Sequence, residues 1–392
     1  LRKLQPPRAN LFAAAASERA RPAACRGPSP GPAEIITRQF INHAGDIPSE
    51  YGDIIQVIAP LSTFNSPALL RLAEFGGVYL DSQFPDGDQN PLFELEMIFT
   101  SPTPGDPNAN KSHGGGPFYD YDLENIGDDK ELYRFHLHIK NNRAKDDYSR
   151  IIEMNKAMGI PAGANFDAAV AEVIDVDQWM RAFATKSLTM DFDGYGSVIY
   201  RHNQNVMFYV RPTDQKVIAL PWDIDGQFAF NASAGNPIYP NQGTTNLTKL
   251  IERPANYRLY LGHLNDMVNT TWNSAYMGRW LTHFSQLAGQ GLSGVLGSIQ
   301  ARGDFVQSKM PAQVPFNVTT ANLHSTANTA IIEGTGWINV KQIRLAGHSE
   351  PLDVSWKKGT GASFANTWDV TLPVSAGNNS FTFELIIAKA KH

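Results

Sequence analysis

The middle of the chain alternates apolar runs with a short polar turn. The run NVMFYV (205–210) is aromatic and aliphatic without glycine or proline, and KVIALPW (216–222) is a second such run. Runs of this length and composition predict buried strands. Between them, RPTDQ places a proline at its fixed φ before Thr and Asp, which favours a turn. We therefore predict a buried β-hairpin over residues 205–222.

Helical periodicity occupies the chain on both sides of this hairpin. Apolar residues at spacings of three and four predict amphipathic helices. These cover residues 147–158, 166–174, 176–188, 256–268 and 274–287. The N-caps expected for the first three helices are Asp146 or Asp147, Asn165 and Asp175. The helix 176–188 carries Trp179, Met180 and Phe183 on one face and delivers the chain to an acidic loop.

Residues 133–140 alternate apolar and polar side chains, which predicts a half-buried strand. His136 and His138 share its polar face. Two histidines without a nearby third ligand favour a solvated face over a metal site. Arg253, ahead of the later helices, is expected to make an ordinary surface ion pair rather than a phosphate contact.

The N-terminal third carries shorter patterns. We predict a helix over 67–75 and strands over 76–84 and 91–99. Residues 101–117 are punctuated by proline and glycine, which predicts a loop. Its run His113–Gly116 offers backbone amides that could cradle phosphate, but no helix start follows it, so a connector is favoured.

Beyond about Met310 the pattern changes from helical to β. Short strands separated by Gly, Asn and Pro clusters predict a small β-sandwich over residues 309–392. Trp356 and Trp368 are expected to fill its core. Stacking of either ring on a sugar is the alternative.

Composition narrows the class of protein. Of the 392 residues, 42% are hydrophobic and 18% are charged, which is typical of a globular chain. A net charge of -5 leaves no basic footprint and argues against nucleic acid as the main partner. Cys25 is the single cysteine, so no intrachain disulfide forms, which fits a cytoplasmic or an exported bacterial protein. The sequence contains no run of 18 apolar residues, so no membrane-spanning helix is predicted. Residues 1–35, rich in Ala, Arg and Pro, predict a disordered leader rather than a signal peptide.

The hairpin is bracketed by acids. Asp193 precedes it, and Asp223 and Asp225 follow its second strand two residues apart, where extended geometry points both to one side. Grouped carboxylates favour a hard, oxygen-binding cation such as magnesium or calcium. Magnesium held by carboxylates and substrate phosphates is typical of phosphoryl transfer. The alternative is that the Asp-Gly pairs at 193–194 and 225–226 only form turns.

These motifs resemble the spore coat protein H (CotH) kinase-like family. The resemblance is carried by Asp193, Asn203 or Asn205, Met207–Tyr209, Pro221–Asp225 and Phe228. It extends from about Tyr133 to Leu287, with separated motifs in the family's order.

The resemblance implies an α+β chain with an atypical two-lobed protein-kinase fold that uses ATP and magnesium, with manganese or calcium as alternatives. Asp193 would orient or deprotonate the acceptor hydroxyl. Asn203 or Asn205 would be the catalytic-loop Asn that binds the cofactor's second metal ion. Asp223, with Asp225 as its rival, would be the metal-binding Asp. Typical kinase spacing would place the Asn at Val198, so an insertion is implied.

By the same resemblance, residues 36–132 would form a divergent or truncated N-terminal lobe and residues 133–308 the main lobe. A protein substrate and an extracellular or cell-surface location in a bacterium are implied. The sequence shows no Lys on a strand paired with a helical Glu, the pair with which kinases contact ATP phosphates. Lys111 lies in the loop and Lys140 follows the predicted strand.

Two classes of function therefore stand side by side. One is an enzyme that transfers phosphate from ATP to protein Ser or Thr. The other is a noncatalytic exported coat or surface module whose acids bind a structural metal. A carbohydrate-associated protein that acts through the sandwich is a third reading, which adds a polysaccharide to the partners considered.

Overall fold

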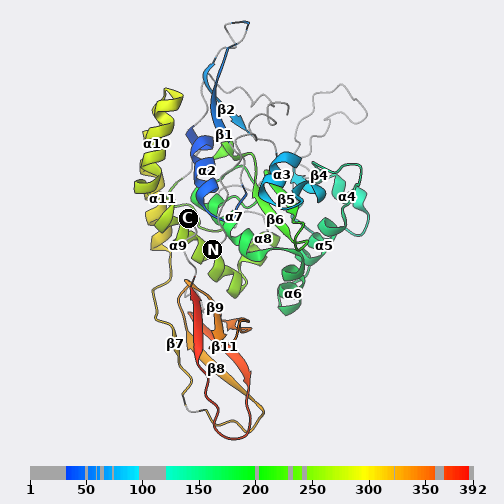
Figure 1. Ribbon diagram of the computed structural model, residues 1–392, viewed down its shortest axis with the longest axis vertical. Coiled ribbons are helices and arrows are strands. Elements are labelled where there is room, and N and C mark those ends of the chain that lie inside the picture. Colours follow the sequence, from blue (N-terminus) through cyan, green and yellow to red (C-terminus); the bar gives the residue numbers. More distant parts are fainter. Residues whose placement is uncertain are drawn as a thin grey trace.

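The computed structural model describes most of the chain as a mixed α+β structure (Figure 1). The described residues are 32–48, 52–58, 60–61, 66–72, 75–96, 121–198, 203–227, 233–240, 245–321, 323–357 and 366–387. The expected α+β class is confirmed. In the described part of the chain, no helix is both long enough and apolar enough to cross a membrane.

The centre is an antiparallel sheet in the order β4-β3-β5-β6. Its strands are β3 (Leu92–Leu95), β4 (Leu137–Ile139), β5 (Val206–Val210) and β6 (Val217–Pro221). The predicted hairpin is confirmed: β5 and β6 pair from Val206 opposite Pro221 to Val210 opposite Val217. All residues of β5 and β6 are buried, which explains why neither strand alternates apolar with polar residues.

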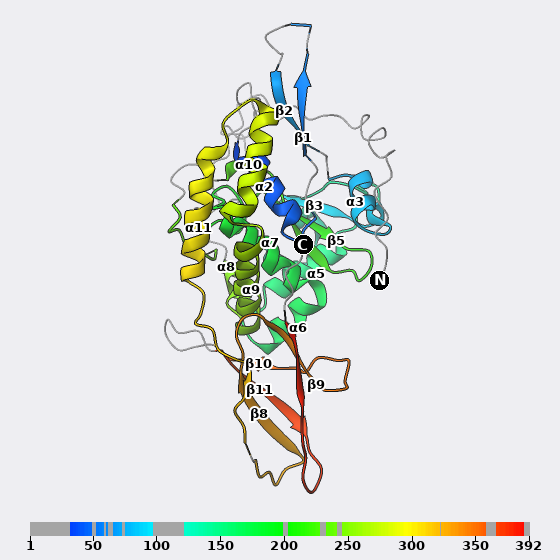
Figure 2. The same ribbon diagram turned by 60° about the vertical axis from the view of Figure 1, so that its left-hand side comes forward.

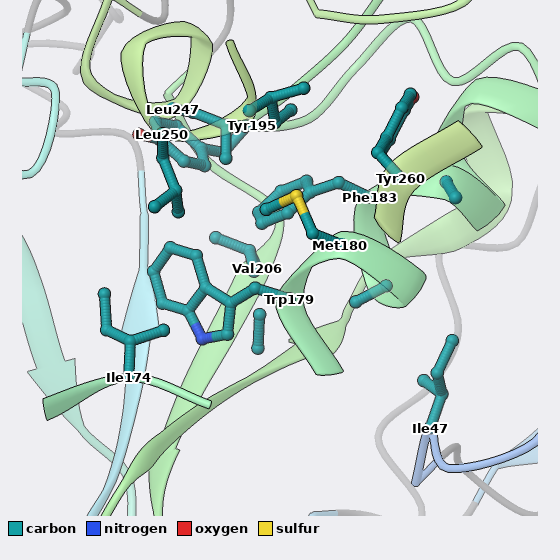
Figure 3. Close-up of a cluster of buried hydrophobic side chains, with 14 of the residues drawn as sticks. Ile47, Ile174, Trp179, Met180, Phe183, Tyr195, Val206, Leu247, Leu250 and Tyr260 are labelled. Carbon is teal, nitrogen blue, oxygen red and sulfur yellow. The ribbon is translucent and has the colours of Figure 1, made fainter. Parts of the chain in front are cut away.

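Helix α7 (Val176–Leu188) covers one face of this sheet. Trp179 stacks on Phe208 of β5 with ring centroids 5.2 Å apart, and its indole N–H donates to the Val217 carbonyl. Figure 3 shows Trp179, Met180 and Phe183 pointing from the helix into this cluster. Loss of a fully buried Trp costs about 3–5 kcal/mol. The apolar face of α7 that the sequence predicts therefore packs against the central sheet in the main core.

The opposite face carries α3 (Gly77–Gln83) and the residues beside it. Phe75, Tyr79 and Leu80 pack on Leu92, Met207 and other inward residues of the sheet. Two predictions are wrong here, since residues 77–83 are helical rather than a strand and β2 (Ser66–Leu72) is a strand rather than a helix. Short apolar runs do not specify their own period, so the partner surface decides. Residues 66–72 pair with β1 (Gly52–Val57), and α3 packs flat on the sheet.

The remaining helices are distributed around the central sheet and α7. They are α2 (Pro32–His43), α4 (Lys130–Arg134), α5 (Ser149–Met158), α6 (Ala164–Val173), α8 (Thr245–Ile251), α9 (Pro254–Thr270), α10 (Ser274–Ala288) and α11 (Leu296–Ser308). In both Figure 1 and Figure 2, α9, α10 and α11 lie together along one side of the molecule. Residues 32–35, which the sequence placed in a leader, belong to α2, and residues 1–31 lie outside the described residues.

The predicted N-caps have mixed outcomes. Asp175 caps α7 as predicted, by accepting from the Gln178 N–H. Asp146 and Asp147 are wrong as caps of α5, because Tyr148 is its N-cap, although Asp147 accepts from the Ser149 N–H. Asn165 is wrong: α6 begins at Ala164 after Gly163, so Asn165 lies inside the first turn. The strand predicted from residue 133 is shorter than expected. Tyr133 and Arg134 end the short helix α4, and the ladder with β3 begins at Leu137.

The C-terminal strands form two antiparallel sheets around their own core. One sheet has the order β10-β11-β8-β7 and the other pairs β12 with β9. Their bounds are β7 (Asn317–Val318), β8 (Thr329–Thr335), β9 (Val340–Leu345), β10 (Ser355–Trp356), β11 (Thr367–Pro373) and β12 (Phe383–Ile387). Trp368 is completely buried in their shared core, whereas Trp356 is half-buried. We call residues 309–387 the β module; its description as a sandwich stays a prediction.

Helix α9 connects the β module to the rest of the molecule. The buried Arg258 donates to the carbonyls of Gly336 and Trp337, and its guanidinium lies 3.3 Å from the centre of the Trp356 ring. Burial lowers the pKa of Arg258 to about 9. Trp337 belongs to the main core rather than to the core of the module. Trp356 therefore packs against Arg258 at this junction, which explains why it is only half-buried in the module.

Candidate active site

The loop after α7 is held by a buried ion pair. Lys186 Nζ lies 2.8 Å from Asp191 Oδ2, and both side chains are at most 4% exposed. Asp191 Oδ1 also accepts from the Asp193 N–H at 3.1 Å, while Lys186 donates to the Asn205 carbonyl at 3.3 Å. One cation–anion pair thus ties the end of α7 to the loop and to the first residue of the hairpin. Asp193 is fixed at its backbone by these bonds.

Two side-chain amides at the start of the hairpin, those of Gln204 and Asn205, contact Asp193 directly. Asn205 Nδ2 donates to its carbonyl oxygen at 2.6 Å, and Gln204 Nε2 donates to its carboxylate at 2.8 Å. Asn203 faces away and donates to the Tyr121 carbonyl at 2.7 Å. The two asparagines left open by the sequence therefore occupy different surroundings, and Asn205 is the one beside Asp193. Gln204 was not among the predicted site residues.

The PWDID segment closes against the same loop. Asp223 has a left-handed backbone (φ 47) before the 3₁₀ turn Ile224–Gly226. A Cβ added to Gly226 would lie 3.0 Å from the Cβ of Asp193 and 3.1 Å from the ring of Phe192. Only glycine allows this approach without a shift of the loop. The turn that carries Asp225 is thus in contact with the residue that carries the proposed catalytic carboxylate.

Negative charge is concentrated around Asp223. Its pKa is raised to about 6, first because surrounding protein atoms displace water and then because of the charges of Asp225, Glu34, Asp193 and Glu94. The solvent-accessible surface of Asp223 nevertheless places it among the exposed residues, so its carboxylate can be reached from solvent. Acids from four parts of the chain therefore act on one accessible carboxylate.

The closely spaced carboxylates of this cluster are suitable ligands for a hard cation. Carboxylate and amide oxygens are the ligands that magnesium and calcium prefer, and a cation would relieve the repulsion that raises the pKa of Asp223. Among the described residues, however, no three His, Cys, Asp or Glu side chains are arranged to hold a metal ion by themselves. The donor set fits a cation that takes one or two carboxylates and completes its shell with water or phosphate.

A Lys–Glu pair lies on the sheet beside this cluster. Lys140 Nζ contacts Glu94 Oε2, and both side chains are largely buried. Glu94 lies on β3 between His138 and Met207 of the neighbouring strands, on the side that faces α3. The sequence pattern does not identify this pair, because its Glu lies on a strand rather than on a helix. The available signal was one acid inside the apolar run PLFEL.

Helix α2 supplies a second missed pair. Glu34 accepts from Arg38 Nη2 at 2.7 Å, with side chains 18% and 6% exposed. Glu34 is one of the charges that raise the pKa of Asp223. It was overlooked because the sequence assigned residues up to 35 to a leader.

The remaining candidates lie elsewhere or outside the described residues. His136 stacks on Tyr121 with ring centroids 4.1 Å apart, and burial lowers its pKa to about 4, so it packs as a neutral ring. Arg253 makes two 2.6 Å bonds to Asp167, as expected for a surface pair. The predictions for Cys25, Lys111, His113–Gly116 and Phe228 concern positions outside the described residues.

Comparisons with known proteins agree with the resemblance to the CotH family. Residues 106–296 match the family model described as CotH kinase protein. A curated relative, Invasin CotH7 of Rhizopus delemar, is 26% identical over 156 residues. That match covers 37% of this chain and 26% of the relative, so the chain corresponds to about a quarter of the relative's length.

A solved structure also shows a distant likeness. It is the HipA, HipB and operator DNA complex of the Shewanella oneidensis MR-1 toxin–antitoxin system, with 12% identity and a TM-score of 0.31. The match covers 70% of this chain and 56% of that chain. At this score the likeness carries no argument about fold or function.

Proposed function

Residues 106–296 belong to the CotH kinase family, and from this premise we propose that the chain transfers phosphate from ATP to Ser or Thr hydroxyls of a protein substrate. The observation that carries the proposal is the contact of two separate acidic segments. The Asp193 loop meets the turn that follows Asp223 at Gly226, and the charges of both segments act on one another. An atypical two-lobed kinase-like fold, with the central sheet beside the site, is part of the proposal.

Each residue has a role in this proposal. Asp193 orients the acceptor hydroxyl and takes its proton, because its carboxylate is held by Gln204 and its backbone by Asn205. Asp223 and Asp225 would hold the divalent cation, magnesium or manganese. When bound, that cation neutralises phosphate charge. Asn205 is preferred to Asn203 as the amide that completes the site, because Asn203 bonds to Tyr121.

The Lys140–Glu94 pair is proposed to contact the nucleotide phosphates. Glu94 acts electrostatically on Asp223, so the pair lies within reach of the acidic cluster. Its Glu comes from strand β3 rather than from a helix, which departs from the usual kinase arrangement.

The test is a titration of ATP with magnesium into the wild type and an Asp223→Ala variant, followed by calorimetry. We expect binding in the wild type and its loss in the variant, with Asp304→Asn on α11 as a control that keeps wild-type binding. Phosphate transfer to protein, detected by mass spectrometry, is expected to disappear in Asp193→Asn. Transfer that persists in Asp193→Asn would falsify the proposed role of this residue.

A noncatalytic surface or coat protein is the second candidate. It is favoured by the name of the fungal relative, an invasin. On this proposal the chain acts at a cell surface and the acids bind structural calcium. Calcium that raises the melting temperature, with no ATP binding, would support it over the kinase. The bacterial origin and the polysaccharide partner implied earlier remain expectations.

A further inference from the structure

A buried glutamine beside Asp193 carries an amide oxygen that the fold leaves without a hydrogen bond. Gln204 is 3% exposed. Its Nε2 donates to the Asp193 carboxylate at 2.8 Å and to the Asp193 carbonyl at 3.3 Å. Its Oε1 is shielded from water and accepts no hydrogen bond from any residue that the structure describes. A buried oxygen without a donor costs free energy, so this one calls for an explanation.

The orientation of this amide follows from its contacts. An ionised carboxylate and a backbone carbonyl only accept hydrogen bonds, so the nitrogen of the Gln204 amide, and not its oxygen, faces Asp193. If the nitrogen and the oxygen exchanged places, the amide oxygen would lie against two other oxygens. Oε1 is bonded to the same carbon atom as Nε2, so it too lies close to the Asp193 carboxylate.

Other buried amides show that this fold can satisfy such a group. Gln178 of α7 donates to the Ala219 carbonyl at 2.7 Å and accepts from the Ala219 N–H at 2.9 Å. Asn203 and Gln227 also carry buried amide oxygens that find no donor in the described part of the chain. Of these unsatisfied amides, the one on Gln204 is bonded to an acid of the candidate active site, whereas the one on Asn203 is bonded to Tyr121.

The surrounding charge determines which ligand this oxygen suits. Three acids of the region, Glu34, Glu94 and Asp191, each form an ion pair with an Arg or Lys side chain. Asp223 and Asp225 form no ion pair with any cation among the described residues, and each acts on the other as a like charge. Unneutralised carboxylates next to an unsatisfied oxygen favour a hard cation over a neutral hydrogen-bond donor.

We propose that Gln204 Oε1 is a neutral ligand of the divalent cation assigned to Asp223 and Asp225. The inference rests on the proposed function, because it adds a ligand to the cation assigned there. Amide oxygens are ligands of hard cations, and this oxygen gives up neither water nor a hydrogen bond when it binds one. The amide of Gln204 thereby connects the cation with Asp193, since its nitrogen already holds that carboxylate.

The test is a titration of Mn²⁺ in the absence of nucleotide, with free Mn²⁺ measured by electron paramagnetic resonance. Gln204→Met removes the oxygen together with the N–H donor, so the affinity for Mn²⁺ is expected to fall about tenfold or more. Gln204→Glu restores an oxygen ligand but still lacks the donor, and its affinity should match or exceed that of the wild type. Gln300→Met on α11, where the glutamine bonds to Asp304, is the matched control and should bind as the wild type does.

The outcomes distinguish a ligand from a residue that only positions Asp193. Equal losses in Gln204→Met and Gln204→Glu would show that Gln204 acts by donating to Asp193, and would overturn its role as a ligand. Unchanged affinity in Gln204→Met, or a wild type that binds no Mn²⁺, would overturn that role as well.

The kinase proposal is judged separately, by phosphate transfer in the wild type. Transfer together with unchanged Mn²⁺ affinity in Gln204→Met removes the ligand and keeps the kinase. Binding of Mn²⁺ that depends on Gln204, without any transfer, keeps the ligand and removes the kinase. If Gln204→Met fails to fold, Gln204→Asn takes its place, because its shorter side chain withdraws the amide and is expected to lower the affinity about tenfold.

Discussion

The carbonyl oxygen of Asp193 accepts a 2.6 Å hydrogen bond from the side-chain amide of Asn205, although twelve positions separate them. Asn205 has a left-handed backbone (φ 58), which asparagine tolerates better than most residues. The bond therefore joins the start of the hairpin to the acidic loop through a residue suited to both tasks. It also distinguishes Asn205 from Asn203, which lies two positions earlier.

Replacement of Asn205 should impair the site more than replacement of Asn203. Asn205→Gly keeps the left-handed backbone and removes the amide, so we expect about a 10- to 100-fold loss in magnesium–nucleotide affinity or phosphate transfer. Asn203→Ala removes only the bond to Tyr121 and should change affinity by less than about threefold, within the range of an indirect effect. Calorimetry and initial rates measure both. Equal losses in the two variants would contradict the assignment.

The raised pKa of Asp223 predicts a pH-dependent stability without divalent cations. In the folded chain the pKa is about 6, above the ordinary value of 3.8, so the folded state binds more protons between these values. The ionised carboxylate therefore destabilises the fold above pH 6, and this penalty is relieved as the pH falls toward 4. In EDTA, Asp223→Asn should melt higher than the wild type at pH 7, and the difference should shrink by pH 4.5.

Divalent cations should reverse this comparison. A bound cation needs the ionised carboxylate, so magnesium or calcium should raise the melting temperature of the wild type above pH 6 and lose effect below it. Asp304→Asn, which lies on α11, is the matched control and should track the wild type at every pH. A pH-independent gap between wild type and Asp223→Asn would argue against the crowded acidic cluster.

Gly226 sets the distance between the two acidic segments. In Gly226→Ala the new methyl group would lie 3.0 Å from the Asp193 Cβ and 3.1 Å from Phe192, so the loop must move. We expect a loss of nucleotide affinity or transfer of about tenfold or more, since small displacements of reacting groups are costly. In the control Gly278→Ala, within α10, the added methyl group would lie 3.8 Å from Leu296 of α11, so this variant should keep activity and gain about 0.5–1 kcal/mol in unfolding free energy. Activity assays with urea denaturation distinguish displacement from general destabilisation.

The sequence predicted the centre of the fold because its signals there are local. The hairpin 206–221 combines two apolar runs with a proline-containing turn, and α7 has an Asp cap followed by an unbroken helical stripe. The predictions for the N-terminal segments were wrong because the signals there are not local. Residues 66–72 and 77–83 are short apolar runs whose conformations are set by their partners, the β1 strand and the α3-bearing face of the sheet.

The site was only partly accessible to the same reasoning. Asp193 and Asp223 could be grouped because both flank one hairpin. Lys140 and Glu94 are 46 positions apart, and their pairing depends on the register between β3 and the segment after β4. Glu34 reaches the cluster only because α2 packs beside the turn Ile224–Gly226. Contacts of this kind follow from tertiary packing, which no local pattern specifies.

Loss of one partner of the Lys186–Asp191 pair should lower the free energy of unfolding more than loss of one partner of an exposed ion pair. Both side chains are almost fully buried, and Asp191 also accepts the Asp193 N–H, so Lys186→Met leaves a charged carboxylate without its cation. Such a loss costs about 3–5 kcal/mol in unfolding free energy. The double variant Lys186→Met/Asp191→Asn removes both charges and keeps an acceptor for the Asp193 N–H, so it should lose less than the single variant. Urea denaturation of the wild type, Lys186→Met, Asp191→Asn and the double variant measures the coupling as a double-mutant cycle. A double variant that loses as much as the sum of the two single variants would show that the charges are not coupled, and the buried pair could not then be what holds the Asp193 loop.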